Sequence, residues 1–302
     1  MTGPSGWVML LIALVAYLLP CQLHGSDLEK GAQAEYVGKV LTLRRFYEGR
    51  RLQFDAKGQL IGQGITGSWT TDGQIEIDSV SLTDKRLQLK GRRRVLVFDS
   101  PNEQPRDVIE ISAGDPLAKM FRQFDQKPWK DFIKNANIEV NLELPSAPKT
   151  EGDFALAMNT VFLGPEDKLG DVVPVFWTYF VLKQSGKRWR PKRTLTQIGK
   201  GDSAPRPLYT PDPEYSETAR RIGFEGTVIF RVTVTESGSL EDLQVTRPLG
   251  LGLDDKAAQA VSTWRFQPAR KDGNPVPVEI SVETSFRFNR ASTDNSRRLL
   301  SH

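Results

Sequence analysis

Few side chains in this sequence could carry out chemistry. Its 302 residues include one Cys, Cys21, and two His residues, His24 and His302. Residues 26–301 therefore contain neither type, which excludes a disulfide, a thiolate nucleophile, a Ser-His-Asp triad and a His/Cys zinc site there. Carboxylates, Lys, Tyr, Ser and Arg remain, but no motif arranges them for acid–base catalysis. We expect no catalytic residue, no metal and no cofactor, and a protein that is not an enzyme.

Composition indicates a globular chain with its own hydrophobic core. Apolar residues make up 38% and charged residues 26% of the sequence, and the length suits about two domains. The 41 basic and 37 acidic residues leave a net charge of +4, which gives no case for a nucleic-acid partner. The basic runs at 92–94 and 187–193 are interpreted as a solvated strand end and a connector.

The first 25 residues are predicted to be a signal peptide or a membrane anchor. The unbroken apolar run Trp7–Leu19 has the length of a signal-peptide core and is ended by Pro20. Cleavage after Gly25 would leave a small residue at the cut, and a lipid-modified Cys21 is a third option. All three alternatives place the bulk of the chain outside the cytoplasm.

We predict a β-rich domain over residues 35–198, after a short polar lead-in at 26–34. Its fold is expected to be mainly antiparallel, a meander or small barrel with one or two helices, which begin near Asp115-Pro116 and Trp129. The expected strands are Val37–Phe46, Arg51–Phe54, Leu60–Thr66, Gly67–Thr70, Gln74–Val80, Arg86–Lys90, Arg94–Phe98, Ile138–Leu144, Phe154–Phe162 and Val172–Leu182.

A linker at 199–210, a second domain at 211–289 and a disordered tail at 290–302 complete the predicted layout. In the second domain, a helix that ends at Gly223 precedes a β-hairpin, a helix capped by Asp254 or Asp255, and a long final strand. That strand, Val276–Phe288, alternates apolar and polar residues, which predicts one buried and one wet face. A late strand in so small a module is expected to leave an unpaired edge that another protein's strand could join.

Five sequence blocks of this second domain, in order and at matching spacing, resemble the C-terminal domain of the TonB family. The blocks are Glu225-Gly226-Thr-Val-Ile-Phe-Arg-Val-Thr-Val, Ser237-Gly238, Leu253-Asp254-Asp255-Lys-Ala257-Ala258, Trp264-Arg265-Phe266-Gln267-Pro268-Ala269 and Asp272-Gly273-Asn-Pro-Val. The resemblance covers about residues 205–289. It implies a small α+β domain with a three-stranded antiparallel sheet and two helices, located in the periplasm.

The resemblance also implies a partner and a mode of binding. An extended segment of an outer-membrane TonB-dependent receptor, or of another envelope protein, would pair with the edge of the last strand. By position, the partner-binding residues would be Val278, Glu279, Ile280, Ser281, Val282, Glu283 and Thr284. Two alternatives remain: the edge is covered within this chain, or the protein forms a homodimer through it.

The chain departs from the family ahead of this domain. A folded domain is predicted where the family has a long Pro-rich spacer. The apolar run Trp7–Leu19 contains no His, and the His nearest to it, His24, lies outside the run. These departures argue against force transduction by the family's usual route. Support for energy-dependent transport stays one expectation, with anchoring in the inner membrane as one option. The alternatives are an exported protein whose N-terminal barrel holds a lipid or small ligand, and an uncharacterised carboxylate-based enzyme.

Overall fold

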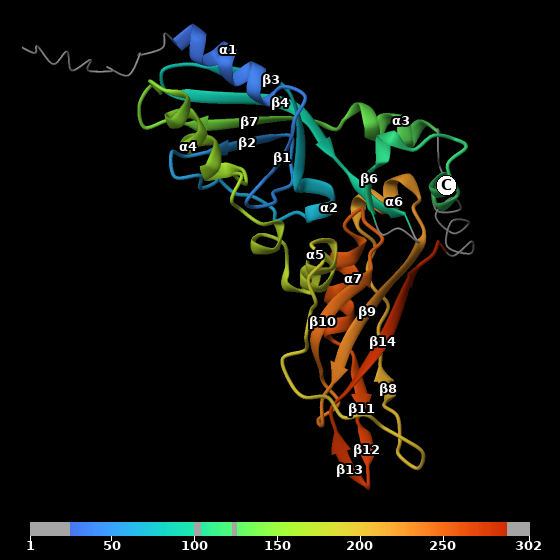
Figure 1. Cartoon of the computed structure of the whole chain (residues 1–302). Helices are drawn as coiled ribbons and strands as arrows, with labels where there is room; N and C mark the ends of the chain where they lie inside the picture. Colours follow the sequence, from blue (N-terminus) through green and yellow to red (C-terminus); the bar gives the residue numbers. More distant parts are fainter. Residues whose placement is uncertain (1–24, 100–103, 123–125, 289–302) are drawn as a thin grey trace, which may run out of the picture.

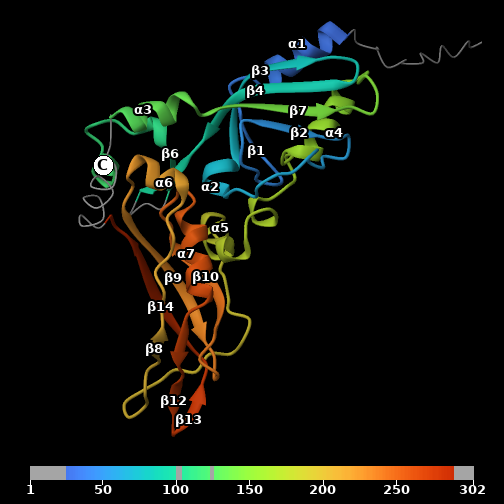
Figure 2. The same cartoon turned by 180° about the vertical axis from the view of Figure 1, so that it is seen from behind.

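Two units meet at a corner to give an L-shaped molecule (Figure 1, Figure 2). The computed structural model describes residues 25–99, 104–122 and 126–288. The predicted signal or anchor segment, apart from Gly25, and the predicted tail at 290–302 lie outside these ranges. Buried apolar side chains of both units form one continuous core. In the described ranges, no helix combines the length and apolarity needed to cross a bilayer.

The first unit is built on a five-stranded sheet with the order β1-β3-β4-β7-β2. All neighbouring strands are antiparallel except β2 and β7, which run parallel. Alternation along β4 buries Leu87 and Leu89 on one face, as expected for a half-buried strand. The strands are β1 (Val40–Thr42), β2 (Arg51–Phe54), β3 (Gln74–Leu82), β4 (Arg86–Arg94) and β7 (Asn137–Glu143).

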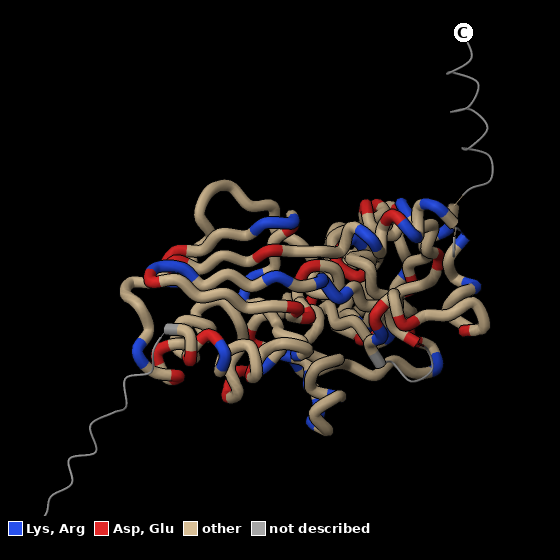
Figure 3. The backbone as a smooth tube through the Cα atoms, turned by 90° about the horizontal axis from the view of Figure 1, so that it is seen from above, with Lys and Arg blue, Asp and Glu red and all other residues tan. Residues whose placement is uncertain are grey.

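Helices and short extended segments surround this sheet. Helix α1 packs against β3 and α4, and acidic and basic residues are interspersed over the unit (Figure 3). The helices are α1 (Gly25–Tyr36), α2 (Trp69–Asp72), α3 (Lys127–Lys134), α4 (Glu151–Val161) and α5 (Thr178–Gln184), with 3₁₀ helices η1 (Val108–Glu110), η2 (Pro116–Met120), η3 (Leu169–Asp171) and η4 (Val175–Trp177). Strands β5 (Leu96–Asp99) and β6 (Gln104–Asp107) form a separate hairpin that leads toward the second unit.

Several expectations for the first unit are wrong. The described strands form an open sheet rather than a closed barrel, so the barrel interior proposed for a ligand does not exist. Residues Phe154–Phe162, expected as a strand, fall largely in helix α4, which Thr150 and Asp153 cap reciprocally. Residues Val172–Leu182 form short helices because their large apolar side chains recur at helical spacing. The lead-in at 26–34 lies within α1, and Gly67–Thr70 enters α2.

The second unit is an antiparallel three-stranded sheet with the order β10-β9-β14; helix α7 packs against β9 and β10, and helix α6 packs against α3 of the first unit. Its elements are α6 (Glu217–Ile222), β9 (Gly226–Val234), β10 (Leu240–Arg247), α7 (Leu253–Ser262) and β14 (Val278–Phe286), with short strands β11 (Arg265–Gln267), β12 (Ala269–Lys271) and β13 (Asn274–Val276). Gly223 ends α6 in the left-handed conformation, at a φ of 68°. The α+β class, the three strands and the two helices agree with the prediction.

The predicted linker contacts the second unit. Strand β8 (Arg206–Tyr209) pairs with β11, and the backbones of Ser203 and Arg270 exchange two hydrogen bonds of 2.9 and 3.0 Å. The second half of the predicted linker therefore contacts the second unit. The predicted domain boundaries stay predictions.

Candidate functional site

Strand β14 lies at one edge of the second sheet. It pairs with β9 without a register break, from Val278 opposite Val234 to Phe286 opposite Gly226. No described strand pairs with its other side. The strand expected to bind a partner is therefore paired within the chain on one side.

Backbone alternation identifies which groups of β14 point outward. In the β9–β10 hairpin, Thr235 N–H donates to Ser239 O, so the odd-numbered residues of β9 pair toward β10. The even-numbered residues of β9 then pair toward β14, where they face even-numbered residues. The N–H and C=O groups of Glu279, Ser281 and Glu283 consequently point away from β9, as do those of Ser285.

The side chains of β14 alternate in the same register. Val278, Val282, Thr284 and Phe286 are buried, and Ile280 is half-buried. The exposed row consists of Glu279, Ser281, Glu283 and Ser285. This row presents short or charged side chains beside the outward backbone groups, so an added strand would meet no large side chain there.

Contacts at the two ends of β14 fix its position. Phe288 N–H donates to Glu225 Oε1 at 2.7 Å, and the Phe288 ring lies 4.6 Å from the ring of Tyr215. Burial raises the pKa of Tyr215 to about 12, and the nearby Glu225 adds to the rise. At the other end, Thr196 N–H donates to Pro277 O at 2.9 Å. The middle of the strand is the part with the open edge.

The opposite edge of this sheet is covered by the first unit. Gln244 on β10 is 4% exposed; its Oε1 accepts from Tyr179 N–H at 2.8 Å, and its Nε2 donates to Val175 O at 3.2 Å. These bonds hold η4 and α5 against β10. The two edges of the sheet thus differ in their access to a partner.

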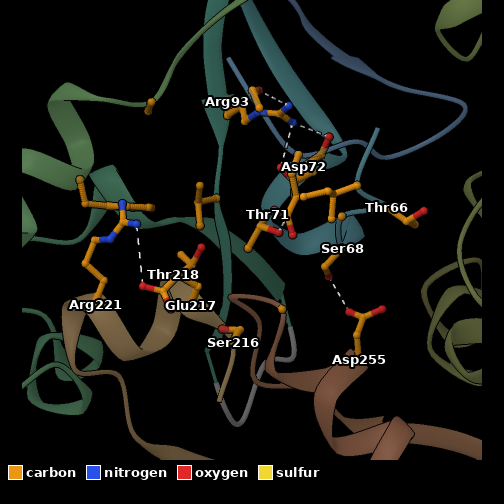
Figure 4. Close-up of a pocket in the computed structure, with 18 of the residues that line it drawn as sticks. Thr66, Ser68, Thr71, Asp72, Arg93, Ser216, Glu217, Thr218, Arg221 and Asp255 are labelled. Atoms are coloured by element: carbon orange, nitrogen blue, oxygen red, sulfur yellow. Dashed lines mark hydrogen bonds and ion pairs between the residues drawn. The ribbon is translucent and has the colours of Figure 1, made fainter. Parts of the chain in front are cut away.

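A second candidate is a cleft of about 630 Å³ between the two units (Figure 4). Two carboxylates line it: the buried Asp72 in α2 and the half-buried Asp255 in α7. Burial raises the pKa of both groups above the usual carboxyl range. Perturbed carboxylates in a cleft are a feature of active sites, and this pair was not predicted from the sequence.

The polar groups of the cleft are bonded within the first unit and across the junction between the units. Asp72 Oδ1 lies 3.2 Å from Arg93 Nη1, and Ser68 Oγ donates to Asp255 Oδ2 at 2.5 Å. Gly252 N–H donates to Thr70 Oγ1 at 2.8 Å. Figure 4 shows Asp255 directed at Ser68. The bonds of Asp255 and Gly252 cross from one unit to the other and help to hold the units together, whereas the Asp72–Arg93 ion pair lies within the first unit.

The basic run Arg92-Arg93-Arg94 is not the solvated strand end that was expected. Arg93 is 9% exposed and donates to the backbone oxygens of residues 47, 49 and 72. Arg92 and Arg94 both bind Asp107, at 2.8 and 3.2 Å. In the described ranges, no group of His, Cys, Asp and Glu is arranged to hold a metal.

Residues 211–288 match the family model described as the Gram-negative bacterial TonB protein C-terminal. This segment is a TonB C-terminal domain. The chain is 41% identical over 83 residues to protein tonB2 of Pseudomonas aeruginosa, covering 27% of this chain and 31% of that protein. Protein TonB of Vibrio cholerae is 33% identical over 77 residues, or 25% of this chain and 32% of its own length.

The chain therefore spans about a third of the length of these curated relatives. A solution structure of the Pseudomonas aeruginosa TonB C-terminal domain matches at 29% identity and a TM-score of 0.25, covering 30% of this chain and 93% of that one.

Proposed function

We propose that this protein is a non-enzymatic envelope protein of TonB type that binds an extended segment of an outer-membrane TonB-dependent receptor by β-strand addition. The segment pairs with the open edge of β14, over Val278, Glu279, Ile280, Ser281, Val282, Glu283 and Thr284. The outward backbone groups of the odd-numbered residues carry this proposal. Main-chain pairing tolerates sequence variation in the partner.

The same proposal places the folded units in the periplasm. The apolar run at 7–19 would export the chain or anchor it in the inner membrane. Its relatives are named TonB proteins, which supports a role in energy-coupled transport. Homodimerisation through β14 would use the same backbone groups and would compete with the receptor.

Proline substitution at two adjacent positions tests the proposal. Ser281→Pro removes an outward N–H and leaves the β9–β14 ladder intact, because proline is tolerated where its N–H would face solvent on an edge strand. We expect it to weaken receptor binding at least about tenfold, with unfolding free energy lowered by no more than about 1 kcal/mol. Ile280→Pro removes an inward N–H and should instead destabilise the fold by about 2–4 kcal/mol.

Binding is measured as capture of purified TonB-dependent receptors from the outer membranes of the same bacterium, with Ser281→Ala as the matched control. Urea unfolding of each variant separates loss of binding from loss of fold. Equal capture of receptors by the Ser281→Pro variant and the Ser281→Ala variant would contradict strand addition at this edge. Sedimentation velocity of the same variants shows whether a homodimer depends on it.

A further inference from the structure

The exposed row beside the open edge carries an uneven set of charges. Glu279, Glu283 and Arg287 occupy every second exposed position along β14 and its continuation, with Ser281 and Ser285 between them. An added strand would place its own side chains about 5 Å from this row, within reach of a Lys, Arg, Asp or Glu side chain.

Glu279 already has a partner within the protein. Its Oε1 lies 3.3 Å from Arg231 Nε on β9, and the Arg231 guanidinium lies 5.1 Å from the centre of the Tyr179 ring. Tyr179 holds the cation over its face, and the cation lies next to Glu279. The charge of Glu279 is therefore compensated within the protein, without a bound partner segment.

Glu283 differs from Glu279 in its surroundings. The residue directly opposite it on β9 is apolar, Ile229. The diagonal neighbour Arg231 is engaged with Glu279, and no described residue forms an ion pair with Glu283. An exposed carboxylate thus remains uncompensated beside the outward backbone groups of its own residue.

Arg287 is uncompensated in the same sense among the described residues. The nearby carboxylate Glu225 is engaged by Phe288 N–H at 2.7 Å and by Arg122 Nη1 at 4.0 Å. Glu283 and Arg287 are four residues apart on one face, one negative and one positive. Together the two opposite charges make the two directions along the edge different for a charged partner segment.

We propose that the segment that joins β14 continues past Thr284 as far as Arg287, and that it carries a basic residue beside Glu283 and, four positions away on the same face, an acidic residue beside Arg287. This inference rests on the proposed strand addition at β14. A parallel segment would have the basic residue first and an antiparallel one the acidic residue first. The two charges fix the register, because a slip of one residue would turn both to the other face.

Designed peptides test the charge pattern. Four ten-residue peptides of alternating Thr and Val, each with a polyethylene glycol tail, differ at two Thr positions four apart: Lys/Glu, Glu/Lys, Gln/Gln and Glu/Glu. We expect one of the two mixed-charge peptides to bind the full chain about two- to tenfold more tightly than the Gln/Gln peptide, and the Glu/Glu peptide to bind no better than Gln/Gln. The preference should fade in about 0.5 M salt.

The matched variant is the double exchange Glu283→Arg with Arg287→Glu, which leaves the net charge of the protein unchanged. It should reverse the preference between the Lys/Glu and Glu/Lys peptides. Equal binding of all four peptides, or an unchanged preference in the double variant, would overturn the charge pattern. Strand addition would still stand if Ser281→Pro weakens peptide binding. Binding that Ser281→Pro does not weaken would instead overturn the proposed function.

Discussion

The two edges of the second sheet differ in whether another part of the chain covers them. At β10 the first unit supplies η4 and α5, and the buried amide of Gln244 bonds to both. At β14 the middle of the strand has no described cover, and its outward row is short or charged. An uncovered edge is an aggregation hazard that proteins usually manage. The contrast shows that the chain covers one edge of this sheet and leaves the middle of the other accessible.

The edges of the first sheet support the same reading. Beside β1, Leu163 N–H donates to Thr42 O at 2.8 Å; beside β2, Ile61 N–H donates to Gln53 O at 2.7 Å. Segments of the chain thus run along both of these edges. Within the described residues, β14 stands out against three covered edges.

Hydrogen exchange gives the largest expected contrast. The amides of Ile280, Val282 and Thr284 point toward β9 and should exchange about a hundredfold more slowly, or slower still, than those of Ser281 and Glu283. The measurement is residue-resolved amide exchange by NMR. Similar protection of both sets would mean that the edge is covered, and the difference between the two edges would disappear.

A buried carboxylate in α7, which accepts hydrogen bonds from the loop after β10, gives a pH-dependent test near the covered edge. Asp254 is fully buried, where it accepts the N–H groups of Leu249 and Gly250 at 2.8 and 2.7 Å, and burial raises its pKa to about 7. Above its usual pKa of 3.8 the unfolded chain releases a proton that the folded chain keeps. This group's contribution to stability is therefore complete below about pH 4 and is lost as the pH rises toward 7.

We expect Asp254→Asn to remove this dependence. The loss in the unsubstituted protein between pH 4 and 7, as much as about 4 kcal/mol, should shrink in the variant. Urea unfolding at several pH values measures it, with Asp84→Asn in the exposed β3–β4 turn as control. Parallel stability curves for the Asp254→Asn variant and the unsubstituted protein would contradict the assignment.

Truncation at each edge gives the smallest contrast. Gln244→Ala leaves the Tyr179 N–H and the Val175 carbonyl without their side-chain partner under η4 and α5, and should lower the unfolding free energy by about 1–3 kcal/mol. Glu283→Ala on the open side should change it by no more than about 0.5 kcal/mol. Denaturant unfolding of both variants measures the difference, and equal losses would argue that β14 is as enclosed as β10.

Much of the second unit could be predicted from sequence because its signals are local. The period-two alternation of Val276–Phe288 gave the strand and its buried face, and Gly223 gave the end of a helix. Alternation alone did not say which backbone groups point outward, since that depends on the register with β9. The partner-binding row stays a prediction that this register sharpens to the odd-numbered positions.

The first unit was less predictable because its contacts are long-range. Phe154, Met158 and Val161 have helical spacing, and the Thr150–Asp153 capping box precedes them, yet the apolar content of the run favoured a strand. The cleft carboxylates Asp72 and Asp255 are distant in sequence and meet only when both units have folded. A single buried arginine, Arg93, looked like one of three surface charges because burial depends on packing against Asp72 and the neighbouring backbone.

The shared core has a practical consequence for the C-terminal domain. Phe224 packs on Phe121 with ring centres 4.5 Å apart, and Leu251 N–H donates to Leu96 O at 2.9 Å, so both residues are buried by the first unit. A fragment that begins at the linker would expose these side chains to water as an apolar patch. Such a fragment would self-associate through a surface that the whole protein never exposes, and its oligomers would say nothing about β14.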